Sequence, residues 1–291
     1  MAPNPVIGRF APSPTGDLHF GSLVAAVGSY LEAKSAGGSW LLRIEDIDPP
    51  REVPGSADRI IRDLEHLGMF PDEPVLYQSS RIHSYEDAVK RLMEQGLAYP
   101  CACSRKDLPA SGVYPGTCRN GIPAGKIARS IRLAVDNGDY AFTDRVQGLV
   151  EDLPASLTGD FVIRRADGLY AYQLAVVVDD EFQRVTQVVR GADLLESTSR
   201  QICLQKALGY KTPAYMHLPV ATTEEGKKLG KRFQADPINQ QNPAYAVYQA
   251  LTFLGQRPPS GLSLASLWEW ALQHWDSSLI PRCSSILPGK V

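Results

Sequence analysis

No segment of the sequence approaches the roughly 20 consecutive apolar residues that a transmembrane helix requires, and its first ten residues lack the basic and apolar regions of a secretory signal. Cysteine is scarce, because five thiols in 291 residues are an odd number and do not indicate a disulfide framework. Neither charge dominates, since 30 basic and 32 acidic residues leave a net charge of −2. These features exclude a membrane span and a generally polycationic nucleic-acid binder, and they favour a cytoplasmic protein.

Two common nucleotide-binding motifs are also missing. The sequence contains neither a GxGxxG dinucleotide fingerprint nor a GxxxxGK[ST] P-loop. Internal repeats and low-complexity tracts are likewise lacking, and no pattern specifies an oligomer, so we expect a monomer. The 44% of hydrophobic residues nevertheless predicts a globular protein with a substantial core.

The beginning of the chain predicts an α/β fold. A short apolar run at 6–10 is typical of a buried strand, and residues 23–34 have helical spacing with Ser22 as a candidate N-cap. A second strand is expected at 39–46. Strand, helix and strand within about forty residues indicate a βαβ unit with parallel strands.

The rest of the chain alternates between helical and strand-like patterns. We expect helices at 56–69, 84–97 (Ala88, Leu92 and Met93 inward), 199–210, 243–255 and 264–275. Strand-like signals lie at 130–135, at 159–180, where Asp167-Gly168 suits a hairpin turn, and at 186–195, where a strand runs into a loop. Composition suggests four segments: 1–98 and 160–232 as two halves of a catalytic domain, 99–159 as a Gly/Pro/Cys-rich insertion, and 233–291 as a short helical C-terminal region.

Charged residues follow three of the apolar runs. Arg9, Glu45 and Arg190 each end a predicted strand, and ligands of open α/β sheets bind beyond the carboxyl ends of strands. One carboxylate and two guanidinium groups at a shared rim would suit a zwitterionic substrate. Taken singly, each is more often a solvated charge.

Two loops offer phosphate-binding chemistry. His19 precedes a helix start, where free N–H groups and the helix dipole favour an anion, and Gly21 permits close approach of a flat base. Residues 225–232 (EGKKLGKR) form a glycine-containing cationic loop that could close on a polyphosphate. Each feature alone is also compatible with a packed histidine or a solvated charge run.

Four segments in order resemble the signature segments of glutamyl-tRNA synthetases: RFAPSPTGDLHFGS (9–22), RIEDIDPPR (43–51), VRGAD (189–193) and KLGKR (228–232). The first carries the HIGH-type motif and the last the KMSKS-type motif. The resemblance implies a class I synthetase fold with a Rossmann-type parallel sheet. It departs from the pattern at Ser22, which replaces the second histidine, and at Gly230, which replaces a serine.

The resemblance also implies roles for individual residues. Glutamate would contact Arg9, Phe10, Ala11, Pro12, Ser13, Glu45, Tyr172 and Arg190, ATP with Mg²⁺ would contact His19, Gly21, Lys228 and Lys231, and His19 and Lys231 would be catalytic. Only 59 residues follow Arg232, fewer than a helical anticodon-binding region needs. The chain therefore resembles the short paralogous family, the glutamyl-Q tRNA(Asp) synthetases, which attach glutamate to queuosine in the anticodon loop of tRNA(Asp). Ordinary glutamylation of tRNA(Glu) and a non-catalytic RNA-binding role are the alternatives.

Three cysteines gather in the predicted insertion. Cys101, Cys103 and Cys118 lie within eighteen residues, which suggests zinc, although three unligated thiols fit the spacing equally well. The resemblance implies one structural Zn²⁺ with Tyr114 as the fourth ligand. The same segment carries Arg119, Lys126, Arg129 and Arg132, which could contact RNA phosphates or form a solvated face.

Overall fold

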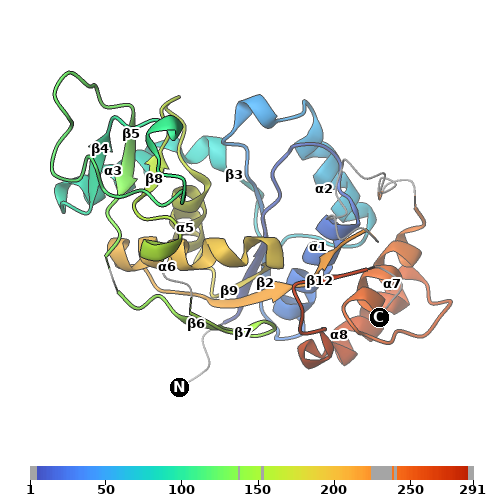
Figure 1. The fold of residues 1–291 in the computed structure, drawn as a ribbon. Helices are drawn as coiled ribbons and strands as arrows, with labels where there is room; N and C mark the ends of the chain where they lie inside the picture. The colour runs from blue at the N-terminus through green and yellow to red at the C-terminus, as the bar shows by residue number, and fades with distance from the viewer. Residues whose placement is uncertain (1–4, 137, 152–153, 224–237, 239–240, 288–291) are drawn as a thin grey trace.

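The computed structural model describes residues 5–136, 138–151, 154–223, 238 and 241–287. Its main sheet has five parallel strands in the order β10-β9-β1-β2-β3 (Figure 1). Their bounds are β1 Ile7–Phe10, β2 Ser39–Ile44, β3 Leu76–Tyr77, β9 Gln187–Gly191 and β10 Ala214–Leu218. The helices are α1 Phe20–Lys34, α2 Ser56–His66, α3 Ile82–Glu94, α4 Pro154–Leu157, α5 Tyr172–Phe182, α6 Leu195–Leu208, α7 Pro243–Phe253 and α8 Leu264–His274.

The expected βαβ unit is confirmed, because α1 connects β1 to β2 and the two strands pair in parallel from Ile7–Ser39 to Phe10–Leu42. β1 also pairs with β9, so the strand order reverses direction between these two strands. In doubly wound sheets the crevice beyond the carboxyl ends at such a reversal is the usual ligand site. The topology therefore points to the ends of β1 and β9.

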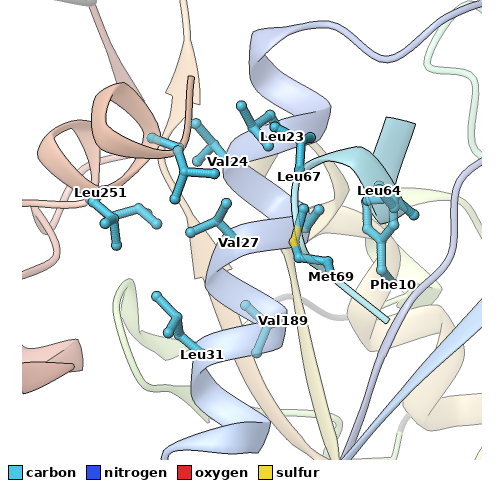
Figure 2. Close-up of a cluster of buried hydrophobic side chains, with 14 of the residues drawn as sticks. Phe10, Leu23, Val24, Val27, Leu31, Leu64, Leu67, Met69, Val189 and Leu251 are labelled. Carbon is cyan, nitrogen blue, oxygen red and sulfur yellow. The ribbon is translucent and has the colours of Figure 1, made fainter. Parts of the chain in front are cut away.

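The sheet separates two apolar cores because successive side chains of a strand point to opposite faces. Val189 and Met216 pack on the face covered by α1, α7 and α8, whereas their neighbours Val188 and Tyr215 pack on the face covered by α3, α5 and α6. Figure 2 shows α1 at the centre of the first core, with α7 on one side and the α2 region on the other. Helix α1 contributes Leu23, Val24, Val27 and Leu31, the α2 region contributes Leu64, Leu67 and Met69, and α7 contributes Leu251.

A second, antiparallel sheet lies at one end of the molecule, with α7 and α8 at the other (Figure 1). It consists of β4 (Ala98–Cys101), β5 (Ser130–Leu133) and β8 (Phe161–Arg164) in that order. Between β5 and β8 the chain forms the hairpin of β6 (Phe142–Asp144) and β7 (Gly148–Val150), and Arg145 N donates to Tyr215 O of β10. The hairpin thus joins the segment that contains the cysteines to the main sheet.

The chain returns to the site near residue 285. Strand β12 (Ser285–Ile286) pairs in parallel with β11 (Val220–Ala221), which follows directly after β10. Val220 N donates to Ser284 O at 2.9 Å and Thr222 N donates to Ile286 O at 2.9 Å. Among the described helices, none has the length and apolar content to cross a bilayer.

Three sequence predictions about elements are wrong. Of the strand-like signals expected at 159–180, the first part forms β8, but residues from Tyr172 onward form helix α5. This helix is buried on nearly all sides, so packing overrides the strand preference of its valines. Ser22 is not an N-cap, because α1 begins at Phe20 and is capped by His19. Met93 was expected to face inward but is 39% exposed.

Candidate functional site

A pocket of about 280 Å³ opens at the carboxyl ends of β1, β2, β9 and β10, beside the first turn of α1. The sequence-predicted residues that line it are Arg9, Phe10, Ala11, Pro12, Ser13, His19, Gly21, Glu45, Tyr172 and Arg190. They come from segments as far apart as residues 9 and 190, which only the parallel sheet brings together. Lys228 and Lys231 lie outside the described residues.

Beneath the pocket, two arginines share one buried carboxylate. Arg9 Nε lies 3.1 Å and Arg43 Nη2 lies 2.8 Å from Asp180 Oδ1. Burial alone would raise the pKa of Asp180, but the two guanidinium groups hold it below its usual range. Arg43 also donates to Gln183 Oε1 at 2.8 Å. Both arginines are therefore compensated within the protein, and they fix the end of α5 against β1 and β2.

Glu45 has weaker interactions with its neighbours than Asp180 has. It is 8% exposed, and in the described part of the chain its Oε1 atom has no hydrogen-bond partner. Arg43 Nη2 is 3.7 Å from that oxygen. Burial raises the pKa of Glu45 to about 7, despite the opposing charges of Arg43 and Arg9. A buried carboxylate that lacks donors and lines a pocket is suited to bind a cationic group of a ligand.

Arg190 is held by neutral groups. It donates from Nε to His217 Nε2 at 3.0 Å, from Nη2 to Thr198 Oγ1 at 2.8 Å and from Nη1 to Tyr172 OH at 3.4 Å. Arg190 is 5% exposed, and no carboxylate of the described chain forms an ion pair with it. The pocket therefore contains one buried cation and one buried anion that an amino acid with an acidic side chain could satisfy.

His19 forms the wall of the pocket nearest α1. Its Nδ1 atom accepts a hydrogen bond from Ser22 N at 3.3 Å and so caps the helix. Acceptance at Nδ1 requires that the proton of a neutral imidazole be on Nε2. Gly21 follows in the first helical turn, where free backbone N–H groups favour an anion.

A candidate metal centre lies beside the second sheet, at the end of β4. The Sγ atoms of Cys101, Cys103 and Cys118 are within 4.8 Å of one another, and all three residues are buried. Tyr114 OH lies 3.3 Å from Cys101 Sγ and 3.6 Å from Cys103 Sγ. Sulfur atoms bound about 2.3 Å from one zinc ion in a tetrahedron are separated by roughly 3.8 Å, and Cys103 and Cys118 are 3.7 Å apart. The donor set and spacing therefore fit zinc.

Of the arginines proposed for this segment, Arg132 is buried, whereas Arg119 and Arg129 are exposed. Arg132 is 8% exposed, donates to Cys101 Sγ at 3.3 Å and stacks its guanidinium 3.8 Å from the centre of the Tyr114 ring. Arg119 pairs with the buried carboxylate of Asp160. Burial opposes it, but hydrogen bonds with Tyr114, Cys103 and Arg132 lower the pKa of Cys101 to about 7. Arg132 is therefore held at the cysteine cluster, whereas the side chain of Arg119 stays 46% exposed beside Asp160.

Sequence reasoning missed the residues behind the pocket. Arg43 and His217 are charged or polar residues inside apolar strands, and that pattern was a usable signal for both. Asp180 carried no such signal, because its partner Arg9 is 171 residues away. Asp144 is 73 residues from its partner His217, whereas Thr198 is only 8 residues from Arg190.

Comparisons with known proteins also point to tRNA synthetases. The family described as tRNA synthetases class I (E and Q), catalytic domain, matches residues 5–111 and 118–261. Over 98% of both chains the sequence is 54% identical to a glutamyl-Q tRNA(Asp) synthetase of Dechloromonas aromatica. Another from Pseudomonas aeruginosa PAO1 is 51% identical over 96% of this chain and 97% of its own.

Among solved structures, a glutamate tRNA ligase from Elizabethkingia meningosepticum in complex with its amino acid superposes with a TM-score of 0.80 at 26% identity. The match covers 96% of this chain and 66% of that chain. The glutamate-tRNA synthetase of Elizabethkingia anophelis gives the same score and identity over 97% of this chain and 68% of its own. This chain thus spans about two thirds of the length of these solved structures.

Proposed function

Because the chain belongs to the class I glutamate and glutamine tRNA synthetases, and within them to the glutamyl-Q tRNA(Asp) synthetases, we propose that it activates L-glutamate with ATP and transfers the glutamyl group to queuosine in the anticodon loop of tRNA(Asp). The single observation that carries this proposal is that Glu45 and Arg190 line the same pocket. Each is a buried charge that a glutamate ligand can balance.

Glutamate recognition follows from the charges. Glu45 would accept the α-ammonium group, whose positive charge compensates the burial of a carboxylate without donors. Arg190 and Tyr172 would bind the side-chain carboxylate, and the segment from Arg9 to Ser13 would shape the remaining wall. The α-carboxylate is then left unpaired and available as the nucleophile.

ATP would bind against the first turn of α1. His19 would donate from Nε2 to the α-phosphate, and Gly21 would let the adenine approach the backbone. Lys228 and Lys231 would bind the pyrophosphate. Mg²⁺ bound with ATP supplies neutralisation of phosphate charge. The α-carboxylate oxygen of glutamate forms a bond to the α-phosphorus, and the bond to pyrophosphate breaks.

In the second step a hydroxyl of the queuosine cyclopentenediol forms an ester with the glutamyl carbonyl carbon, and AMP leaves. No protein nucleophile is needed, so the residues act by positioning and by charge stabilisation. We infer that the protein acts as a cytoplasmic monomer, which sedimentation of the purified chain would test.

The test has two stages. Exchange of pyrophosphate into ATP should depend on glutamate and on no other amino acid. Labelled glutamate should then be transferred to tRNA(Asp) that carries queuosine, but not to the same tRNA with guanosine or after periodate cleavage of the diol. Transfer to the 3′ end of tRNA(Glu) would instead support an ordinary glutamyl-tRNA synthetase. Absence of any exchange would support a non-catalytic RNA-binding paralogue.

We also propose that Cys101, Cys103, Tyr114 and Cys118 hold one structural Zn²⁺, which would fix the loops next to β4 and β5. Metal analysis should find one zinc per chain in the wild type and none in Cys118→Ser. Cys203→Ser is the matched control, because Cys203 is a buried thiol outside the cluster. A wild-type protein without zinc would contradict the assignment.

A further inference from the structure

We propose that Asp144 and His217 are positioning residues that hold Arg190 without compensating its charge, and that this arrangement makes the pocket select glutamate over glutamine. The inference deepens the proposed function and rests on it. Neither residue lines the pocket, so both would act through Arg190.

The first step is the contact between Arg190 and His217. Arg190 Nε donates to His217 Nε2 at 3.0 Å, and Thr198 Oγ1 also lies 3.2 Å from that ring nitrogen. Because a guanidinium group can only donate, the ring must present a lone pair at Nε2. The imidazole must therefore be neutral, with its proton on Nδ1.

Asp144 enforces this tautomer from the other side. His217 Nδ1 is 2.6 Å from Asp144 Oδ2, and both residues are at most 1% exposed. Asp144 Oδ1 accepts hydrogen bonds from Val146 N at 3.0 Å and Gln147 N at 2.9 Å, which fixes the carboxylate as an acceptor. Burial, the largest cause, lowers the pKa of His217 although Asp144 opposes it, and the charges of Arg190 and Arg9 lower it further.

The comparison with the neighbouring arginines shows why this matters. Asp180 sits directly on Arg9 and Arg43, and that contact compensates them within the protein. At Arg190 the aspartate is one imidazole ring further away, so a neutral acceptor holds the guanidinium in place. The positive charge then remains for the ligand. A side-chain carboxylate can balance it, whereas the carboxamide of glutamine leaves it buried and unpaired.

The sharpest variant is Asp144→Asn. The amide oxygen can keep the bonds from Val146 N and Gln147 N, which places the NH₂ group opposite His217 Nδ1. That donor forces the ring proton onto Nε2, where it faces Arg190 Nε, and two donors then oppose each other. In glutamate-dependent pyrophosphate exchange we expect KM for glutamate to rise by about 30-fold or more and the preference for glutamate over glutamine to fall by at least about tenfold.

A second pair of variants remains decisive if Asp144→Asn does not fold. The carbonyl of His217→Gln can reach the position of Nε2 and accept from Arg190, whereas His217→Asn reaches only the position of Nδ1. We expect His217→Gln to retain more of the glutamate preference than His217→Asn, with KM for ATP unchanged in both.

Equal glutamate preference in the wild type and all folded variants would overturn the inference while leaving the proposed function intact. Failure of the wild type to activate glutamate would instead overturn the proposed function. Calorimetry of glutamate and glutamine binding to the same variants would still show whether Arg190 pairs with the side-chain carboxylate of the ligand.

Discussion

At the scale of single residues, the molecule separates its buried charges into two groups. Arg9 and Arg43 share the buried carboxylate of Asp180 at the base of the pocket. Glu45 and Arg190 line the pocket with weaker compensation, and they depend on the ligand. Breaking a compensated pair should therefore affect stability, and titrating an uncompensated group should affect binding.

The pH dependence of glutamate binding tests the second group. With a pKa of about 7, Glu45 should be roughly 90% ionised at pH 8 and roughly 10% ionised at pH 6, so KM for glutamate should rise about tenfold between them. Glutamate itself does not titrate in this interval. In the free enzyme the raised pKa has the opposite effect on folding: stability conferred by the protonated form is lost as the pH rises through 7.

Glu45→Gln is the control for this profile, because it cannot titrate. Its KM for glutamate should be high and independent of pH between 6 and 8. A slope that persists in this variant would assign the titration to another group.

Asp180→Asn tests the first group. It removes the carboxylate that two buried guanidinium groups share, which should lower the free energy of unfolding by about 3–5 kcal/mol. The matched control is Glu94→Gln, which breaks the exposed Lys90–Glu94 pair on α3 and should cost only about 0.3–0.5 kcal/mol. Similar losses in the two variants, measured by denaturant unfolding, would contradict the special role of Asp180.

At the scale of elements, the sequence was informative where pattern and packing agree. The strands before Arg9, Glu45 and Arg190 could be predicted because apolar runs of strand length end there in charged residues. Helix α5 could not, because three successive valines favour a strand until burial against α3 and α6 decides otherwise. Its Asp180 was therefore also missed as the partner of two arginines.

Helix α1 also approaches the sheet closely at the turn that leads into β2. A Cβ atom on Gly38 would lie 2.2 Å from Val6 O and 3.0 Å from Ala33 O, both backbone atoms. Gly38→Ala should therefore push β1 and β2 apart and cost about 2–3 kcal/mol of folding free energy. At Gly37, with φ of +67° and no atom within 4 Å, Gly37→Asn should be nearly neutral because asparagine tolerates this backbone region.

Thermal unfolding of the two variants provides the measurement. If Gly38→Ala were as stable as Gly37→Asn, the start of β1 could shift without loss of folding free energy.

At the scale of the whole molecule, one pocket depends on distant parts of the chain. Strand β11 lines the pocket through Val220 and Ala221, and its backbone N–H groups are bound by carbonyls of the β12 segment. From β11 the chain continues towards Lys228 and Lys231. The segment around residue 285 therefore supports the pocket wall that β11 forms, the side at which we propose that ATP binds.

Deletion of residues 284–291 should expose this dependence. Without the carbonyls of Ser284 and Ile286, β11 loses two backbone hydrogen bonds, and we expect KM for ATP to rise about fivefold or more, the equivalent of one lost bond. Glutamate affinity should change little, because no hydrogen bond or ion pair joins Glu45 or Arg190 to residues 284–287, the described part of this segment. Deletion of residues 288–291 alone keeps β12 and serves as the control. An unchanged KM for ATP in the longer deletion would remove β12 from the site.

The pairing of β11 with β12 also has a consequence for biosynthesis. On the ribosome the chain emerges from its N-terminus, so β1, α1 and β2 can form early, whereas β12 emerges after the other described strands. The strand partner of β11 is thus supplied only after the chain between residues 221 and 285 has been made. A nascent chain should bind glutamate before β12 can pair with β11, which would delay the reaction until that pairing forms.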